Sequence, residues 1–243
     1  MDAFIQIFYS IIGWFDQLDK SIILEINSHY NDYFDVFMMW VSDKWIWVPM
    51  YCSILYVIAK TKKIETVMVV LGVVLTVVLC DQISASIFKP IFHRFRPAQD
   101  PEIGQLCHVV CGYGNSLYGF VSSHAANTFG VAVFLTLVFR NKLFELFIFF
   151  WALINCYSRM YLAAHYLGDI VCGAILGALL GWLSYWIYKK LVLLLPQFHY
   201  IQHKNNSRAN VDFPTKEILP FFWTYIVTFA FIALSSTKHI IFC

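Results

Sequence analysis

Charged residues are scarce in this chain: Asp, Glu, Lys and Arg make up 13% of its 243 residues, against 60% that are hydrophobic. A typical soluble domain has about 25% charged residues and about half apolar ones. A single core of this length does not need so much apolar surface. The surplus excludes an ordinary soluble domain and predicts an integral membrane protein whose helices face lipid.

Strong net charge and basic clusters are also missing. The formal net charge is only +2, and no Lys/Arg-rich run is long enough to bind nucleic acid, so we expect no nucleic-acid partner. No basic region precedes the first apolar run, which argues against a cleaved signal peptide. Cys107, His108 and Cys111 match no common zinc pattern, and we expect no metal and no cofactor. The two cysteines form either a disulfide or a pair of free thiols.

Long apolar runs predict an all-α, polytopic membrane helical bundle in a single domain over residues 1–243. A helix that spans the bilayer needs about 20 apolar residues. On that basis we expect five or six transmembrane helices, at 45–59, 64–88, 123–139, 143–158, 165–187 and 218–235. No pattern in the sequence predicts an oligomeric state.

The remaining segments need a different interpretation. Within residues 1–40 the apolar run IQIFYSIIGWF is short and acidic residues follow it. We therefore expect N-terminal amphipathic helices that lie in the membrane interface, with a spanning helix as the alternative. Residues 199–217 are polar and are interpreted as a solvated cytoplasmic connection that leads to the last transmembrane helix, 218–235.

The basic residues predict the orientation of the bundle. Counted from the first span, ten of the 17 lysines and arginines fall on one side, in the connections at 60–63, 140–142 and 188–217. By the positive-inside rule that side is cytoplasmic. The opposite helix ends then face the exterior, which for a bacterial inner membrane is the periplasm.

Three polar stretches meet on the outer side. They are KPIFHRFRP at 89–97, FVSSHAAN at 120–127 and SRMYLAAHYLGD at 158–169. The order of the spans alone brings them to one membrane face, although they lie far apart in the sequence. Charges near a low-dielectric region are expensive and usually functional. The convergence therefore predicts the functional site.

These stretches carry groups that suit phosphate. Lys89, Arg96 and Arg159 supply cations, and arginine offers a planar fork to phosphate oxygens. Ser122 and Ser123 supply hydroxyls, and backbone N–H groups at the start of a helix favour an anion. The set predicts an oxyanion cradle.

Two histidines and a carboxylate indicate nucleophilic and acid–base chemistry. His165 and Asp169 are four residues apart, which predicts one shared helix face. A carboxylate that fixes one imidazole nitrogen leaves the other free to attack, and His124, on another helix, is suited to protonate a leaving oxygen. Spacing alone does not rank the two histidines, but the neighbouring carboxylate favours His165 as the nucleophile.

Together the three stretches resemble the motifs of the type 2 phosphatidic acid phosphatase family, which are K-x6-R-P, P-S-G-H and S-R-x5-H-x3-D. The first is matched by Lys89, Arg96 and Pro97, and the third by Ser158, Arg159, His165 and Asp169. In the second, Ser122 and His124 match, whereas Val121 and Ser123 replace the proline and the glycine. These departures affect loop geometry, and they put substrate fit in question more than chemistry.

The resemblance implies a metal-independent lipid phosphate phosphatase with its catalytic bundle at 45–187. It implies that His165, held by Asp169, attacks phosphorus and forms a phosphohistidine. His124 would protonate the leaving group and then help to activate water. The phosphoryl oxygens would be held by Lys89, Arg96, Arg159, Ser122 and the backbone N–H of Ser123.

The implied partners are the lipid bilayer and a phosphorylated membrane lipid. An outward-facing site suits recycling of a carrier lipid diphosphate or removal of phosphate from lipid A, and undecaprenyl diphosphate is expected first because it is the more widespread substrate. Lipid A, phosphatidylglycerophosphate and phosphatidate are alternatives. A different class of function is a lipid-phosphate transporter or binding protein, although paired broken helices and repeat symmetry are missing from the sequence. An inactive relative is a further alternative, given Val121 and Ser123.

Two further features have a structural interpretation. Arg94 has no motif position, and we expect it to anchor a helix end at the lipid headgroups. Gly173, Gly177 and Gly181 recur every four residues, which is typical of close helix packing. Residues four positions apart on an α-helix are rotated by about 40° from one another, so Gly181 need not share the contact that Gly173 makes.

Overall fold

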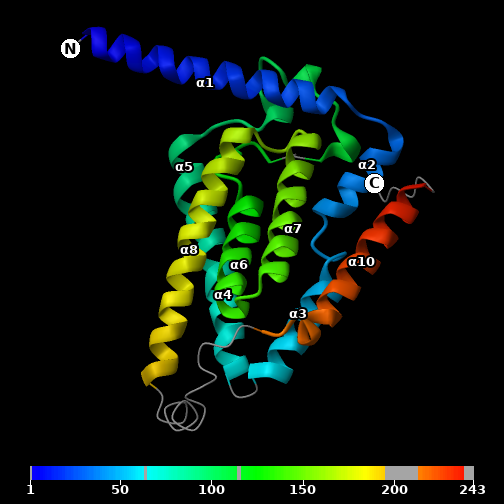
Figure 1. The fold of residues 1–243 in the computed structure, drawn as a ribbon. Helices are drawn as coiled ribbons and strands as arrows, with labels where there is room; N and C mark the ends of the chain where they lie inside the picture. Colours follow the sequence, from blue (N-terminus) through cyan, green and yellow to red (C-terminus); the bar gives the residue numbers. More distant parts are fainter. Residues whose placement is uncertain (1, 63–64, 114–115, 195–212, 238–243) are drawn as a thin grey trace.

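The fold is described from a computed structural model (Figure 1). The structure describes residues 2–62, 65–113, 116–194 and 213–237, with side chains from residue 13 onward. The helices are α1 (Asp2–Ser28), α2 (Asp32–Ser42), α3 (Val48–Lys62), α4 (Thr66–Ile83), α5 (Lys89–Phe92), α6 (Ser123–Phe139), α7 (Lys142–Tyr161), α8 (Leu167–Leu194) and α10 (Thr215–Thr237). These ranges contain no strand, so the all-α prediction is confirmed.

Among the described residues, four helical segments are long and apolar enough to cross a membrane: Thr66–Phe92, Lys142–Tyr161, Leu167–Leu194 and Thr215–Thr237. The helices α6 and α3 have 17 and 15 residues, whereas a bilayer core about 30 Å thick needs about 20. Along α4 the side chains of Val67, Leu71 and Val74 are exposed. An apolar exposed surface suits lipid, in agreement with the predicted membrane bundle.

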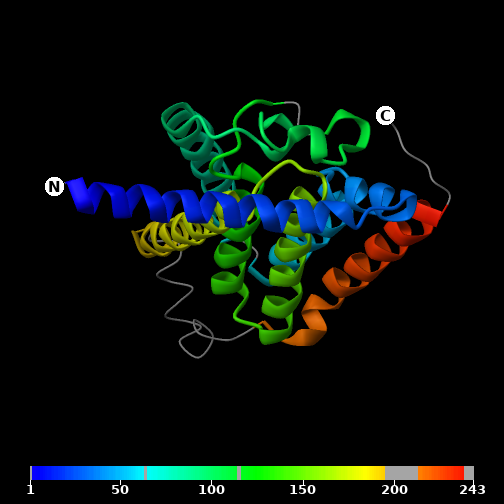
Figure 2. The same ribbon diagram turned by 90° about the horizontal axis from the view of Figure 1, so that it is seen from above.

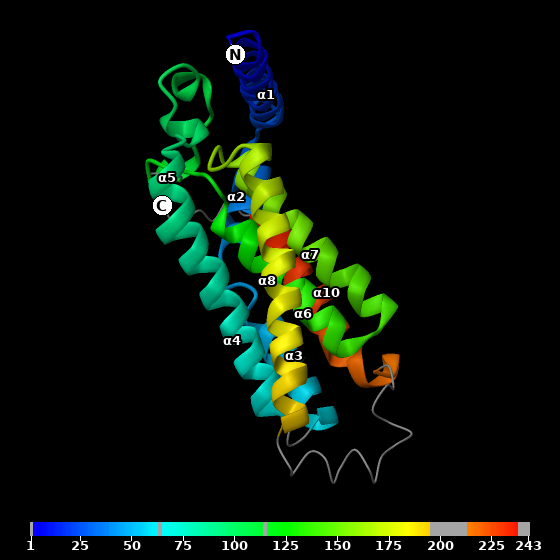
Figure 3. The same ribbon diagram turned by 90° about the vertical axis from the view of Figure 1, so that its left-hand side faces the viewer.

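The helix α6 lies in the middle of the bundle, packed against α4, α7 and α8. Figure 3 shows α4 and α8 running side by side along much of their length. A Cβ atom at Gly173 would lie 2.6 Å from the carbonyl oxygen of Ser122, and Cβ atoms at Gly177 and Gly181 would overlap the α6 backbone. All three glycines therefore contact α6, the last one included, because α6 follows the i, i+4 row of α8.

A second group of helices, α2, α3 and α10, lies beside α7 (Figure 1). The ring of Trp47 is buried between Trp151 and Phe229, at centroid distances of 6.1 and 5.3 Å. At the other end of the group, the backbone N–H of Phe213 donates to the carbonyl of Phe139. Of the predicted connection 199–217, residues 199–212 lie outside the described residues.

The helix α1 does not run along the bundle but lies across one end of it (Figures 1 and 2). Asp19 and Ile23 face the bundle, whereas Trp14 points outward and is 61% exposed. A helix with an apolar outer face suits the interface between water and lipid. An interfacial position stays our prediction for residues 1–40.

Candidate active site

The structure brings the three polar stretches together at the end of the bundle that α1 crosses. The first stretch follows α4, the second leads into α6, and the third turns from α7 into α8. The backbone N–H of Arg96 donates to the carbonyl of Leu117 at 3.0 Å, and that of Ser122 to the carbonyl of Asp169 at 3.0 Å. Backbone hydrogen bonds thus connect the second stretch both to the third and, through the loop before it, to the first.

His165 lies in the turn between α7 and α8, and Asp169 lies in the first turn of α8. The predicted helix face shared by the two residues is therefore wrong, because the helix begins at Leu167. Ala163 adopts a φ of 50°, which is unfavourable for a residue with a side chain. This left-handed residue helps to reverse the chain and brings His165 back towards Asp169.

The side chains of His165 and Asp169 are 1% and 0% exposed. Nδ1 of His165 lies 3.5 Å from Oδ2 of Asp169, and it has no hydrogen-bond partner among the described residues. The distance is that of an ion pair, without the geometry of a hydrogen bond. Contacts between a histidine and a carboxylate that orients it often shorten when substrate binds. The pair is thus arranged as a histidine oriented by a carboxylate.

Gly119 leaves the space that this pair occupies. A Cβ atom at Gly119 would lie 2.9 Å from Oδ2 of Asp169 and 3.4 Å from Nδ1 of His165. Any side chain here would push against one of the two residues. Sequence analysis missed this role; its signal is a glycine directly before the stretch FVSSH.

The predicted phosphate-binding cations surround the histidine. Arg96 and Arg159 are 9% and 4% exposed, and Lys89 is half-buried. Lys89 directly follows the π-helical turn Ser84–Phe88, a distortion that is frequent at functional sites. Burial, and then the charge of Arg159, lower the pKa of Arg96 to about 10. A bound anion would relieve both effects.

Arg159 contacts two residues that sequence analysis missed. Its Nη1 donates to Oγ of Ser42 at 2.6 Å and contacts the hydroxyl of Tyr113, whose ring lies 4.7 Å from the guanidinium. Its Nε is buried and has no hydrogen-bond partner among the described residues. A buried donor without an acceptor is rare, and this Nε is available to donate to a ligand oxygen. Ser42 ends α2, and no motif signals it.

The two serines have structural partners of their own. Oγ of Ser122 caps α6 and accepts from the backbone N–H of Ala125 at 3.4 Å. Oγ of Ser123 lies 2.7 Å from Oγ of Ser84 in the π-helical turn. Ser123 thus fastens the start of α6 to the segment that carries Lys89.

His124 lies in the first turn of α6, where it lines a cavity of about 520 Å³ between α3, α4, α6 and α7. The charges of Arg159, Arg96 and Lys89 act on both His124 and His165. The two histidines therefore share one cationic environment, although they come from different elements.

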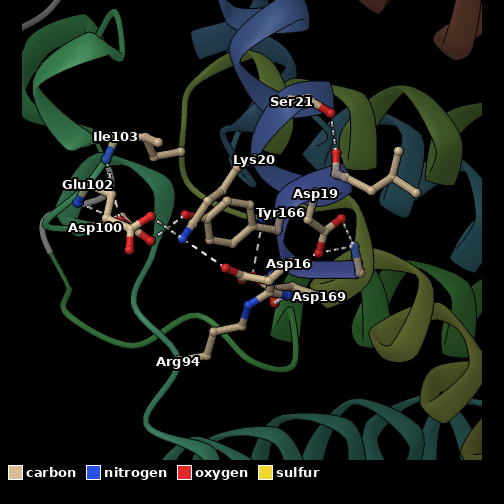
Figure 4. Close-up of polar contacts among 12 residues, drawn as sticks. Asp16, Asp19, Lys20, Ser21, Arg94, Asp100, Glu102, Ile103, Tyr166 and Asp169 are labelled. Atoms are coloured by element: carbon tan, nitrogen blue, oxygen red, sulfur yellow. Dashed lines mark hydrogen bonds and ion pairs between the residues drawn. The ribbon is translucent and has the colours of Figure 1, made fainter. Parts of the chain in front are cut away.

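Arg94 is not a headgroup anchor, so that interpretation was wrong. Its Nη1 donates to Oδ1 of Asp169 at 2.9 Å, and its Nη2 donates to Oδ2 of Asp19 at 2.8 Å (Figure 4). The guanidinium also lies 4.3 Å from the ring of Tyr166. Sequence analysis could not anticipate these contacts, because the partner Asp19 comes from a helix whose position no motif predicts.

Metal-ligand groups and cysteines add little to the site. The described residues contain no group of three or more His, Cys, Asp or Glu side chains that could hold a metal ion. Cys107 is a free thiol, whereas Cys111 is disulfide-bonded, so both alternatives considered for this pair are wrong. Cys107 packs into the apolar cluster around Ile23, and Cys111 is exposed.

The pH dependence of His165 provides a test of this environment. Burial, followed by the charges of Arg159, Arg96 and Lys89, lowers the pKa of His165 well below its ordinary value of about 6.5. A nucleophilic histidine must be neutral, so we expect kcat/KM to show no loss from His165 near pH 6.5. Lys89→Met removes one cation and should move the acidic limb of the pH profile to higher pH.

The control for this measurement is Lys142→Met, because Lys142 is 95% exposed at the opposite end of the bundle. We expect it to leave the acidic limb where it is in the wild type. An acidic limb that stays in place in Lys89→Met would show that Lys89 does not act on the histidine.

Comparison with known proteins identifies relatives of this chain. The PAP2 superfamily matches residues 66–193, which contain all three polar stretches. The chain is 40% identical to a lipid A 4'-phosphatase of Bacteroides thetaiotaomicron, over 76% of this chain and 83% of that protein. It is 34% identical to a lipid A 4'-phosphatase of Porphyromonas gingivalis, over 71% and 73%.

One solved structure is also similar, the crystal structure of Aquifex aeolicus LpxE. It is 22% identical, with a TM-score of 0.48, and the match covers 68% of this chain and 92% of that one. The family resemblance drawn from the motifs is confirmed by the family match and by the two relatives. The chain belongs to the PAP2 superfamily and is a membrane lipid phosphatase.

Proposed function

We propose that this protein is a lipid A phosphatase that releases the 4'-phosphate. The observation that carries the proposal is the similarity to two lipid A 4'-phosphatases, at 40% and 34% identity. Undecaprenyl diphosphate, the substrate expected first from the sequence, has no such support. That expectation depended on how widespread the substrate is and on no residue of the chain.

The cavity beside His124 supports a lipid phosphate as the substrate. Its volume of about 520 Å³ lies in the range usual for small-molecule sites. Its walls are mainly apolar and include Trp47, Ile54 and Val73. A mainly apolar cavity with a histidine in its wall suits a molecule that carries both hydrocarbon and phosphate.

In the proposed reaction Nε2 of His165 attacks phosphorus while Asp169 holds the proton on Nδ1. The bond between phosphorus and the sugar oxygen breaks, and His124, which takes up a proton once the bound phosphate offsets the surrounding cations, donates that proton to the sugar oxygen. His124, now neutral, then takes a proton from water. The resulting hydroxide attacks phosphorus, the P–N bond breaks, and the electron pair returns to Nε2.

The cations contribute charge stabilisation in both steps. We propose that Lys89, Arg96 and Arg159 hold the non-bridging phosphoryl oxygens, with help from the hydroxyl of Ser122 and the backbone N–H of Ser123. Phosphoryl transfer needs little beyond positioning and charge stabilisation. Donors fixed in advance in a buried site are far more effective than donors in water.

We also propose that the site faces the periplasm from the inner membrane. The support is the distribution of basic residues. Four basic residues lie at the end of the bundle opposite the site: Lys60 and Lys62 in the last turn of α3, Arg140 directly after α6, and Lys142 at the start of α7. The positive-inside rule assigns that end to the cytoplasm.

Phosphate release by the purified protein in detergent, with EDTA present, tests the proposed function. The substrates are lipid A with both phosphates, lipid A without the 4'-phosphate, undecaprenyl diphosphate, phosphatidylglycerophosphate and phosphatidate. We expect release from the first lipid A and little from the second, with a product that mass spectrometry shows to lack only the 4'-phosphate.

Two outcomes would contradict the proposal. If phosphate is released faster from one of the other lipids than from lipid A, that lipid is the substrate and lipid A is not. Release that is lost in EDTA and restored by a divalent metal would remove the metal-independent mechanism.

A further inference from the structure

Asp169 depends on a charged partner that no motif of the family resemblance assigned. The carboxylate is buried, and its Oδ2 accepts from the backbone N–H of Tyr166 at 3.1 Å. Its Oδ1 accepts from Nη1 of Arg94 at 2.9 Å, the one side-chain hydrogen bond to this carboxylate within the described residues. A buried carboxylate stays ionised only with strong partners. Arg94 is therefore placed to keep Asp169 charged and oriented.

Arg94 is in turn held by α1. Its Nη2 donates to Oδ2 of Asp19 at 2.8 Å and more weakly to Oδ1 of Asp16 at 3.4 Å. Burial alone would lower the pKa of Arg94, but Asp169, Asp19 and Asp16 outweigh burial and raise it. The guanidinium is thus permanently charged and bridges α1 to the start of α8 (Figure 4).

Asp19 has a second contact with the same region. Its Oδ1 accepts from the backbone N–H of Gly168 at 3.0 Å, in the first turn of α8. A carboxylate at this position stabilises a helix N-terminus. A Cβ atom at Gly168 would lie 2.6 Å from Oδ2 of Asp19, so the glycine permits the approach.

The position of α1 does not depend on Arg94 alone. Nζ of Lys20 lies 2.8 Å from Oε2 of Glu102, and Nδ2 of Asn27 donates to the carbonyl of Tyr161 at 2.7 Å. These contacts hold α1 against Glu102 and against the end of α7, and neither involves Arg94. A change at Asp19 can therefore remove one interaction without undocking the helix.

We propose that Arg94 and Asp19 are positioning residues for catalysis: Asp19 on α1 orients Arg94, and Arg94 orients Asp169 against His165. Neither residue touches substrate. The inference rests on the proposed function of His165 and Asp169, and it makes α1 a working part of the active site.

The test is a double-mutant cycle of Arg94→Gln and Asp19→Asn, with phosphate release measured on the best lipid substrate. Partners that orient a catalytic ligand are worth about 10- to 100-fold at metal sites, and we expect losses of that order in kcat for Arg94→Gln. Asp19→Asn keeps the size of the side chain and an acceptor for Gly168, and should lose about 10-fold.

Because Asp19 acts through Arg94, the double variant should be about as active as Arg94→Gln alone. If the fold-losses in kcat of the two single variants multiply in the double variant, Asp19 does not act through Arg94 and the proposal is overturned. The matched control is Glu102→Gln, which removes an ion pair of α1 without touching Arg94 and should leave kcat unchanged.

Two readouts separate positioning from a merely structural role. In Arg94→Gln, kcat should fall while KM for the lipid stays nearly unchanged, because Arg94 does not touch substrate. Guanidinium ions should restore part of the activity of Arg94→Ala, whereas sodium ions should not.

A loss that falls on KM instead of kcat, with no rescue by guanidinium ions, would overturn the proposal and leave Arg94 a structural residue. If the wild type turns over lipid and both Arg94→Gln and Asp19→Asn have the same kcat as the wild type, the positioning role is refuted while the proposed function stands. Absence of wild-type turnover on every lipid would remove the proposed function together with it.

Discussion

His165→Ala is expected to abolish phosphate release, with a fall in kcat of about 10⁴-fold or more. The substitution removes the nitrogen that we propose attacks phosphorus, and no other histidine lies beside Asp169 in the part of the chain that the structure describes. Oxyanion contacts from Arg96 and Arg159 remain, so binding of the lipid should persist. Single-turnover phosphate release and lipid co-purification measure the two effects separately.

His29→Ala is the matched control for this variant. His29 is exposed beyond the end of α1, with its Nδ1 2.8 Å from the carbonyl of Glu25, far in sequence from the motifs. We expect it to leave kcat unchanged. Substantial turnover by His165→Ala would refute the phosphohistidine mechanism, whichever lipid is used.

Gly177→Ala should have the largest effect on folding. A Cβ atom at residue 177 would overlap the backbone of Ala126 in α6, and a backbone cannot turn aside as a side chain can. Overpacking typically costs about 1–3 kcal/mol, and we expect a value at the upper end. The two helices carry His124 and Asp169 at their starts, so activity should fall together with stability. Thermal unfolding in detergent measures the loss.

The same substitution at Gly13 provides the comparison. A Cβ atom added at Gly13 of α1 would have no neighbouring atom within 4 Å. Alanine is a better helix former than glycine by about 1 kcal/mol, so Gly13→Ala should leave the melting temperature unchanged or raise it. Equal melting temperatures for Gly177→Ala and the wild type would contradict the close approach of α6 and α8.

The meeting of the three polar stretches could be predicted from the sequence because it depends only on the order of the spans. Long apolar runs fix which ends of the helices share a membrane face, whatever the details of packing. Lys89, Arg96 and Arg159 are accordingly found around His165. The close helix packing at Gly173, Gly177 and Gly181 could also be predicted, because small residues four positions apart commonly let two helices approach closely.

The local geometry of the site was harder to predict from the sequence. The spacing of His165 and Asp169 suggested a helix, but the left-handed turn at Ala163 delays the start of α8 until Leu167. A deviation of two residues at a helix boundary is within ordinary variation. The chain reversal, and not the helical repeat, therefore brings the side chains of His165 and Asp169 together.

The role of Arg94 could not be predicted, for a different reason. A basic residue near the end of a span is usually an interface anchor. Nothing in the sequence predicts that α1 lies against the loop that carries Arg94. The partners Asp16 and Asp19 lie some 75 to 78 residues away in the chain. Contacts of that kind depend on tertiary docking, which short motifs do not encode.

The charged inner face of α1 has a consequence for the order of assembly. Its partners Arg94, Glu102 and Gly168 all follow it in the chain. During synthesis from the N-terminus, α1 is therefore made before any surface exists on which those charges can be neutralised. Docking of α1 on the site therefore requires that the chain up to Gly168, in the first turn of α8, has already been made.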